Sequence, residues 1–275
     1  MRTSQRRLRG GTTIERHARS EAEEARHHIR AGEWTGPTLG LAPGFVQANL
    51  VVLPQELATD FERYCSLNPA ALPLLETTGI SSPVPKKLAP TADLRTDLPR
   101  YRLYRRGRLI EDPTDIVTLW RSNYVAFLIG CSFTFDNLLH ARGITARPTA
   151  VGGNVPMFVT NRMTHSAGAF SGPLVVSMRA IAKDDIARAI ELTRAMPTTH
   201  GAPLQVGAPE DIGISDLSSP DYGVPLTVEE GEVPAFWSCG VTTQAAAVHS
   251  KIRLMITHAP GHMFITDRPL DEHAG

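Results

Sequence analysis

The sequence predicts an α/β fold, with a larger three-layer-like α/β domain and a smaller inserted α/β two-layer domain. Short apolar runs typical of strands alternate with segments of helical periodicity along most of the 275 residues. Two similar stretches, at 124–139 and 233–251, each place a cysteine between a predicted strand and a predicted helix. A strand–helix–strand pattern separates them and predicts an inserted domain at 149–231. The larger domain then comprises 13–148 and 232–275.

The N-terminal part predicts a leader, a helix and a buried strand, in that order. Residues 1–12 are rich in arginine and lack an apolar core, which indicates a disordered leader. In 13–31, alanine and isoleucine recur at helical spacing among charged residues, so we expect an amphipathic helix that ends at Gly32. The apolar run Phe45–Leu53 predicts a buried strand, and Pro54 then leads into a second helix.

The remaining elements follow from apolar periodicity and from glycine and proline stops. We expect a helix after Cys131 that ends at Gly143, and another helix at 183–195. The last two apolar runs, 254–257 and 263–267, flank a Pro-Gly turn and predict a β-hairpin. Further strands are expected around Leu109-Ile110 and at 157–161, 173–180 and 203–206.

Composition and charge favour a globular protein in a reducing compartment. The chain has 42% hydrophobic and 20% charged residues, which is too apolar for a disordered chain, and a net charge of +0. Neutrality gives no general attraction to nucleic acid or to anionic membranes, and no apolar stretch is long enough for a transmembrane helix. Three cysteines without a CxxC spacing indicate no disulfide framework and fit the cytoplasm.

Cys131 and Cys239 are the strongest candidates for catalysis. Each is expected at the N-terminus of a helix, where free N–H groups and the helix dipole hold anions and lower the pKa of a thiol. Ser132 and Thr242 add hydroxyl groups that can bind a substrate. Two facing thiols could act as proton donor and acceptor, or as nucleophile and partner. The alternative is that both are small buried apolar residues, which is our interpretation of Cys65.

The segment Asp93–Arg102 concentrates charged residues without helical or strand periodicity. Arg95 or Arg100 could clamp a substrate carboxylate through two parallel hydrogen bonds. The alternative is a surface loop in which aspartates and arginines pair with each other. A nucleic-acid patch is disfavoured, because few aromatic residues accompany the arginines and the chain as a whole is neutral.

Amide and imidazole side chains complete the predicted site. Asn49 and Asn161 stand among apolar residues and could orient a small polar ligand, although turn and cap hydrogen bonds explain such amides equally well. His200 and His258 are candidate general bases. The spacing of His258 and His262 around a turn matches no strong metal motif, so we expect no metal ion.

Several longer strings resemble a known family. They include Gly-Phe-Val-Gln-Ala-Asn-Leu at 44–50, Asp-Leu-Arg-Thr-Asp-Leu-Pro-Arg-Tyr at 93–101, Ile-Gly-Cys-Ser-Phe at 129–133 and Phe-Trp-Ser-Cys-Gly-Val-Thr at 236–242. From about Glu15 to Asp267 the chain resembles the "putative hydro-lyase" family, which is related to the mitochondrial D-glutamate cyclase. The resemblance implies a two-domain α/β protein with lyase activity. For the cyclase relative, it implies conversion of D-glutamate to 5-oxo-D-proline with loss of water.

These observations leave three functions open. The first is a lyase that acts on a small acidic amino acid, with D-glutamate as the leading substrate and no metal or organic cofactor required. The second is a non-catalytic protein that binds a small carboxylate, since helix N-termini and arginines would serve both purposes. The third is an epimerase or dehydratase of another amino or hydroxy acid. In each case the expected partner is a small carboxylate rather than nucleic acid or membrane, and a homo-oligomer is compatible with the sequence.

Overall fold

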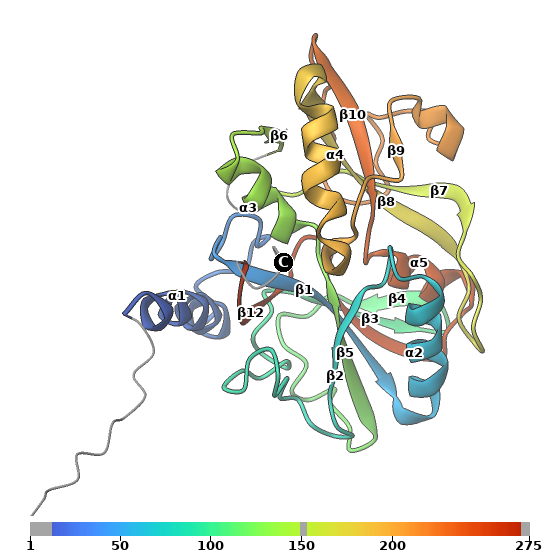
Figure 1. Cartoon of the computed structure of the whole chain (residues 1–275). Helices are drawn as coiled ribbons and strands as arrows, with labels where there is room; N and C mark the ends of the chain where they lie inside the picture. The colour runs from blue at the N-terminus through green and yellow to red at the C-terminus, as the bar shows by residue number, and fades with distance from the viewer. Residues whose placement is uncertain (1–12, 149–152, 271–275) are drawn as a thin grey trace, which may run out of the picture.

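The protein has a mixed α/β fold with two antiparallel sheets, which confirms the predicted class (Figure 1). The structure is a computed structural model that describes residues 13–148 and 153–270, so the predicted leader at 1–12 lies outside the described residues. The α-helices are α1 (Thr13–Arg30), α2 (Ala58–Leu67), α3 (Phe133–Ala141), α4 (Ile186–Arg194) and α5 (Thr242–His249). Single turns of 3₁₀-helix lie at Gln55–Leu57, Lys183–Asp185, Pro197–Thr199 and Pro209–Ile212.

The first sheet has seven strands in the order β2-β5-β1-β11-β3-β4, and β12 also pairs with β1. Its strands are β1 (Phe45–Pro54), β2 (Leu74–Thr77), β3 (Tyr101–Arg105), β4 (Arg108–Glu111), β5 (Tyr124–Gly130), β11 (Leu254–His258) and β12 (Phe264–Pro269). Every residue of β1 is buried, as its continuous apolar run predicts for a strand covered on both faces.

The second sheet has five strands in the order β6-β8-β10-β9, and β7 also pairs with β8. Its strands are β6 (Ala146–Arg147), β7 (Met157–Met163), β8 (Pro173–Ala182), β9 (Gln205–Val206) and β10 (Glu232–Ser238). The predicted strand–helix–strand unit is present as β8, α4 and β9, with β10 between the two strands. This sheet extends beyond 149 and 231 at both ends, and the division into two domains stays a prediction.

The last two strands do not form the predicted β-hairpin. Both run antiparallel to β1, with β11 opposite residues 51–52 and β12 opposite residues 45–48. They therefore run in the same direction, as one strand interrupted by a loop, and the hairpin prediction was wrong. A Pro-Gly turn stops strand pairing in either case, so the sequence signal does not distinguish a reversal from an interruption. Asn49 and Leu50 of β1 lie opposite the interruption.

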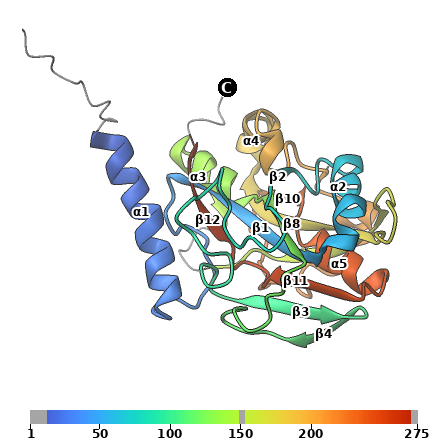
Figure 2. The same ribbon diagram turned by 90° about the horizontal axis from the view of Figure 1, so that it is seen from below.

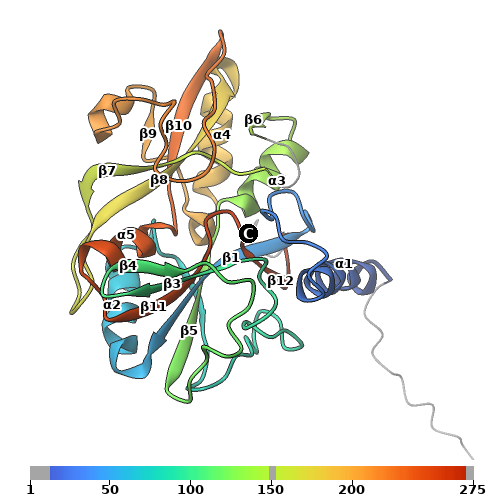
Figure 3. The same ribbon diagram turned by 180° about the vertical axis from the view of Figure 1, so that it is seen from behind.

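The helices that follow the two cysteines cross between the sheets. Helix α3 follows β5 of the first sheet, but its Phe135 and Leu139 pack with Trp237 of the second sheet. Helix α5 follows β10 of the second sheet, yet Ala246 and Ala247 belong to the core of the first sheet. Figures 1 and 3 accordingly show α3 beside α4, and α5 beside β3 and β4. Each cysteine thus lies where the chain passes from one sheet to the other.

Helix α1 covers the edge of the first sheet that β12 forms. Its buried face carries Ala22, Ala25 and Ile29, which pack against Phe45 and Ile265, and Figure 2 shows the helix alongside β12. This is the amphipathic helix that the periodicity of 13–31 predicts. In the described part of the chain, no helix is both long and apolar enough to cross a membrane.

Candidate active site

Cys131 and Cys239 occupy two turns of the same local geometry. The backbone N–H of Phe133 donates to the sulfur of Cys131 over 3.4 Å. The backbone N–H of Val241, also two residues after its cysteine, favours the thiolate of Cys239 and so lowers the pKa of that thiol. The N–H three residues after each cysteine, in Thr134 and Thr242, donates to the cysteine carbonyl, at 3.1 and 3.0 Å. Each sulfur therefore lies at the start of a helix, as the sequence pattern predicts.

Packing brings the two turns together. Both cysteines are buried in one apolar cluster, whose other members include Leu39, Val175 and Met263. Asn49 of β1 contacts both turns, since its Nδ2 donates to the carbonyl of Gly130 at 2.6 Å and its amide fills the space beside Gly240. A Cβ atom at Gly240 would lie only 2.4 Å from Cγ of Asn49, so this close approach requires glycine. The predicted site residue Asn49 is therefore the element that joins the two cysteine turns.

Burial keeps both thiols protonated at neutral pH. It raises the pKa of Cys239 to about 11 and raises the pKa of Cys131 further, because a thiolate is poorly solvated there. The N–H groups at the helix starts and the positive charge of Arg179 oppose this rise in both pKa values. A proximal Cys239 thiolate would also raise the pKa of Cys131. The resting pair is thus suited to donate protons rather than to attack as thiolates.

A buried ion pair lies beside the first turn. Arg179 of β8 donates to both carboxylate oxygens of Asp136 in α3, and to the hydroxyl oxygens of Ser132 and Ser177, over distances of 2.6 to 2.9 Å. The guanidinium also lies 5.1 Å from the centre of the Phe135 ring. Because the Arg179 side chain is 0% exposed, these partners replace its hydration and fix the position of Ser132.

A second arginine lies beside the second turn. Arg102 of β3 donates to Oε1 of Gln244 at 3.2 Å, and the hydroxyl of Tyr104 donates to the same oxygen at 2.9 Å. The Gln244 amide nitrogen donates to the carbonyl of His258 at 3.0 Å, so both ends of this buried amide are held. The Arg102 guanidinium lies 5.9 Å from the centre of the Tyr222 ring.

Both predicted bases are buried and neutral. Burial lowers the pKa of His200 to about 4 and the pKa of His258 to about 4. Nδ1 of His200 lies 2.9 Å from the carbonyl of Ala70, and Nδ1 of His258 lies 3.2 Å from the backbone of Leu50, opposite the interruption between β11 and β12. Each ring has one buried nitrogen, Nε2, without a hydrogen-bond partner among the described residues.

A cavity of about 230 Å³ lies beside α3, and neither Cys131 nor Cys239 lines it. Asp136, the partner of Arg179, lines it together with Leu39 of the cysteine cluster and Asn137. The amide nitrogen of Asn137 is buried and has no partner within the described part of the chain. Drug-sized ligands occupy pockets of roughly 300–1,000 Å³, so this cavity fits a smaller molecule such as an amino acid.

The two arginines predicted to bind substrate have partners within the chain. Arg95 forms a two-pronged ion pair with Asp93, which is the internal pairing that the sequence offers as an alternative. Arg100 is 40% exposed, and its guanidinium lies 3.9 Å from Asp112. A role for them in binding substrate stays a prediction that their surroundings do not support.

The other predicted polar residues differ in position. Ser132 lies beside Cys131 and accepts a hydrogen bond from Arg179. Thr242 is buried at the second turn, where its hydroxyl accepts the N–H of Val175 at 3.0 Å and so anchors β8 to the turn. Asn161 is exposed on β7 and packs against Gly213.

Sequence reasoning missed Arg179 and Gln244. Arg179 interrupts the apolar run of a buried strand, and a charged residue in that position usually has a buried partner. Gln244 stands in an Ala-rich helix as its sole amide side chain. Both signals are visible in the sequence, but neither identifies the partner, since Asp136 and Arg102 are distant along the chain.

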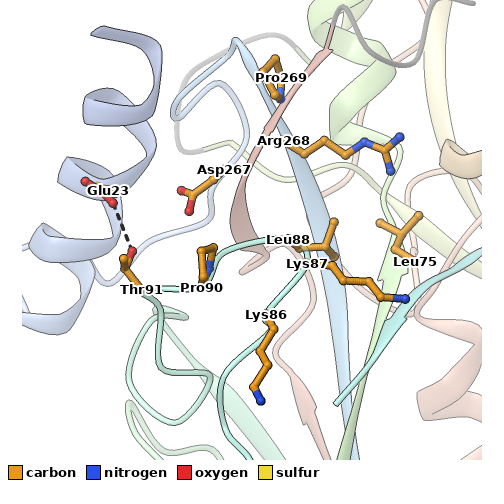
Figure 4. A pocket seen from close by; sticks show the side chains of 10 residues that line it. All are labelled: Glu23, Leu75, Lys86, Lys87, Leu88, Pro90, Thr91, Asp267, Arg268 and Pro269. Atoms are coloured by element: carbon orange, nitrogen blue, oxygen red, sulfur yellow. Dashed lines mark hydrogen bonds between the residues drawn. The ribbon is translucent and has the colours of Figure 1, made fainter. Parts of the chain in front are cut away.

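Another pocket, of about 490 Å³, lies between α1, the loop at 86–91 and the end of β12 (Figure 4). Lys86, Lys87 and Arg268 line it, but so do the carboxylates of Glu23 and Asp267. Glu23 accepts a hydrogen bond from Thr91, and Asp267 is 2.6 Å from Arg26. None of the cysteines lines this pocket, and the described residues contain no cluster of three metal-ligating side chains. The chemically distinctive groups therefore gather at the cysteine turns.

Comparison with known proteins identifies the family of this chain. A family model described as D-glutamate cyclase matches residues 125–267, from β5 to β12, and so includes both cysteine turns. A "putative hydro-lyase" of Rubrobacter xylanophilus is 56% identical over 90% of this chain and 95% of its own length. A "putative hydro-lyase" of Geobacillus kaustophilus is 52% identical over 90% of this chain and 94% of its own length. A "putative hydro-lyase" of Bordetella pertussis is 50% identical over 89% of this chain and 88% of its own length.

The protein is therefore an enzyme of the hydro-lyase class. The chain belongs to the D-glutamate cyclase family. Among solved structures, a nitrogen repressor-like protein from Methanococcus jannaschii matches with a TM-score of 0.38 and 8% identity over 86% of this chain and 90% of its own. A TM-score this low carries no argument about fold or function.

Proposed function

We propose that this hydro-lyase converts D-glutamate into 5-oxo-D-proline and water. The amine nitrogen attacks the γ-carboxyl carbon, a C–N bond forms, and one C–O bond of that carboxyl group breaks. Two protons leave the ammonium nitrogen, and both end on the oxygen that departs as water. The family description names this substrate, and the site supplies groups for both proton transfers.

The observation that carries the proposal is the pairing of two protonated thiols at matched helix starts in one buried cluster. A thiol with a raised pKa can protonate the departing oxygen, and the helix N–H groups stabilise negative charge that develops there. His200 and His258 are neutral at pH 7 and are the candidate acceptors of the amine proton; with a pKa lowered to about 4, either imidazole is a weak base, and the negative charge of a bound substrate would strengthen it.

Incubation of the purified protein with D-glutamate and, separately, L-glutamate tests the proposal. We expect 5-oxoproline, detected by mass spectrometry, from the D enantiomer. If folded protein forms no 5-oxoproline from either enantiomer, glutamate is not the substrate. Formation from L-glutamate alone would keep the reaction and reverse the chirality.

A second candidate is chemistry at the α-carbon, such as epimerisation of an amino acid. The matched cysteine turns favour it, because two thiols on opposite sides of one carbon can remove and return a proton. The two reactions give products with different isotopes at the α-carbon when they run in D₂O. Epimerisation introduces deuterium there, whereas cyclisation leaves the α-hydrogen in place. Mass spectrometry of the product therefore separates them.

We further propose that the protein acts in the cytoplasm on a free small-molecule carboxylate. Support comes from its three free, buried cysteines, which suit a reducing compartment. Fractionation of cells followed by immunodetection would test the location.

A further inference from the structure

The two cysteine turns each place a polar side chain five residues after the cysteine, against an arginine from a strand. Asp136 follows Cys131 by five residues and binds Arg179. Gln244 follows Cys239 by five residues and binds Arg102. The geometry is thus repeated, but the chemistry differs, because the partner in the first turn carries a negative charge and the partner in the second is neutral.

This difference leaves Arg102 without a hydrogen-bonded carboxylate, and its one ion pair among the described residues is the 3.7 Å contact with Asp112. Arg179 donates to both oxygens of a carboxylate, whereas Arg102 has no hydrogen bond to a carboxylate among the described residues. The nearest carboxylate, Asp112, is 3.7 Å from Nε of Arg102 and is shared with Arg100 at 3.9 Å. Nε of Arg102 is itself buried and has no hydrogen-bond partner in the described part of the chain.

Tyr222 links Arg102 to the cluster that contains both thiols, and Arg102 is within reach of solvent. The Tyr222 ring that faces its guanidinium packs against the cluster containing both cysteines. The Arg102 side chain is 22% exposed, whereas that of Arg179 is 0% exposed. A small anion can therefore reach Arg102, and the ligand would bridge the arginine and the second cysteine turn.

We propose that Arg102, held by Gln244 and flanked by Tyr222, binds the α-carboxylate of the substrate amino acid. The inference rests on the proposed function for the identity of that amino acid. The α-carboxylate keeps its charge throughout cyclisation, so a fixed guanidinium can hold it in substrate and product while the γ-carboxyl reacts beside the thiols. Arg179 does not serve, because Asp136 already occupies it.

Calorimetric titration of D-glutamate and of its α-amide, D-isoglutamine, into four variants tests the proposal. Arg102→Gln removes the cation, and Gln244→Glu gives Arg102 the acidic neighbour that Arg179 has. Arg100→Gln is the matched control, since it removes an exposed guanidinium near the same aspartate. Arg102→Lys keeps the charge but loses the planar fork. Circular dichroism melting verifies that each variant is folded, and Arg102→Gln alone is sufficient if Gln244→Glu does not fold.

We expect Arg102→Gln and Gln244→Glu to weaken D-glutamate binding by about tenfold to a hundredfold, the range of a charge-assisted hydrogen bond. Binding of D-isoglutamine should stay within about twofold in both variants, and Arg100→Gln should bind both ligands like the wild type. The affinity of Arg102→Lys for D-glutamate should lie between those of the wild type and Arg102→Gln. Equal losses for the acid and the amide would overturn the inference, as would unchanged binding of D-glutamate.

The inference and the proposed function can fail separately. Binding of D-glutamate that depends on Arg102, without formation of 5-oxoproline, would keep the subsite and remove the reaction. Turnover of D-glutamate with unchanged KM in Arg102→Gln would keep the reaction and remove the subsite. If the wild type binds neither D-glutamate nor the simple dicarboxylate glutarate, Arg102 is not a carboxylate site.

Discussion

Arg179 donates hydrogen bonds to both carboxylate oxygens of Asp136, at 2.9 and 2.6 Å, and this ion pair joins β8 to α3. Strand β8 belongs to the second sheet, and α3 follows a strand of the first, so the pair fastens the two sheets together beside Cys131. The two side chains are 0% and 9% exposed, respectively. Removal of Asp136 would therefore leave the charge of the fully buried Arg179 without a counter-charge.

Asp136→Asn should lower the free energy of unfolding by about 3–5 kcal/mol, because it leaves the Arg179 charge buried without a counter-charge. Arg95→Gln is the control, since its ion pair with Asp93 is about one-third exposed and should contribute only about 0–1 kcal/mol. Urea unfolding of both variants measures the difference. Similar small losses in the two variants would contradict the assignment of a buried, structurally required pair.

Replacing either site cysteine with alanine should lower kcat/KM for 5-oxoproline formation by about a hundredfold or more, the usual contribution of a general acid or base. Cys65→Ala is the matched control, because Cys65 is also buried and free but lies in the core of the first sheet. Its turnover should stay within about twofold of the wild type. Full activity in both Cys131→Ala and Cys239→Ala would mean that the two cysteines serve only as small buried apolar residues.

The buried histidines should make stability sensitive to mild acid. The pKa of His200 is lowered from its ordinary value of 6.5 to about 4, so the folded protein binds this proton less readily than the unfolded chain does. The stability that neutral His200 provides is fully present above pH 6.5 and is lost as pH falls toward 4. By linkage this loss reaches about 2 kcal/mol at pH 5.

His200→Gln should therefore lose less stability than the wild type between pH 7.5 and pH 5, by about 2 kcal/mol. Urea midpoints at several pH values give this comparison directly. His249→Gln, which changes an exposed histidine, should follow the wild-type pH profile. Parallel profiles for all three proteins would mean that His200 is not the acid-sensitive group.

Gly240→Ala should disturb the contact between the two cysteine turns. The new Cβ would lie 2.4 Å from Asn49, which must then give up its 2.6 Å hydrogen bond to Gly130. We expect a loss of about 1–3 kcal/mol of stability together with reduced turnover. Gly79→Ala places a Cβ in open space and should change the free energy of unfolding by less than about 0.5 kcal/mol. Calorimetric melting and the 5-oxoproline assay measure the two effects.

Local sequence patterns predict most strands and helices because each follows from its own residues. The buried strand β1, the amphipathic α1 and the strand–cysteine–helix turns all have strong periodicity and clear stops. The interruption between β11 and β12 could not be predicted, because the same Pro-Gly signal serves a hairpin and a break. Only pairing with β1 decides between them, and pairing is a long-range property.

In the candidate site, too, local signals could be predicted from the sequence and long-range partners could not. The position of the cysteines at helix starts could be predicted, because a thiol at a strand-to-helix turn has a local signature. The arginines could not be assigned, because Arg95 and Arg102 look alike in one charged segment and differ only in their distant partners. Asp93 is two residues from Arg95, whereas Gln244 reaches Arg102 only through the fold.

The crossing of α3 and α5 between the sheets makes the packing of each sheet depend on the other. A fragment limited to 146–238 would keep Trp237 but lose Phe135, whose ring lies 5.1 Å away, and the rest of the chain would keep a helix without its contact surface. The two thiols share one buried cluster only after both sheets and both helices have formed. A partly folded species in which one sheet is missing should therefore show no turnover.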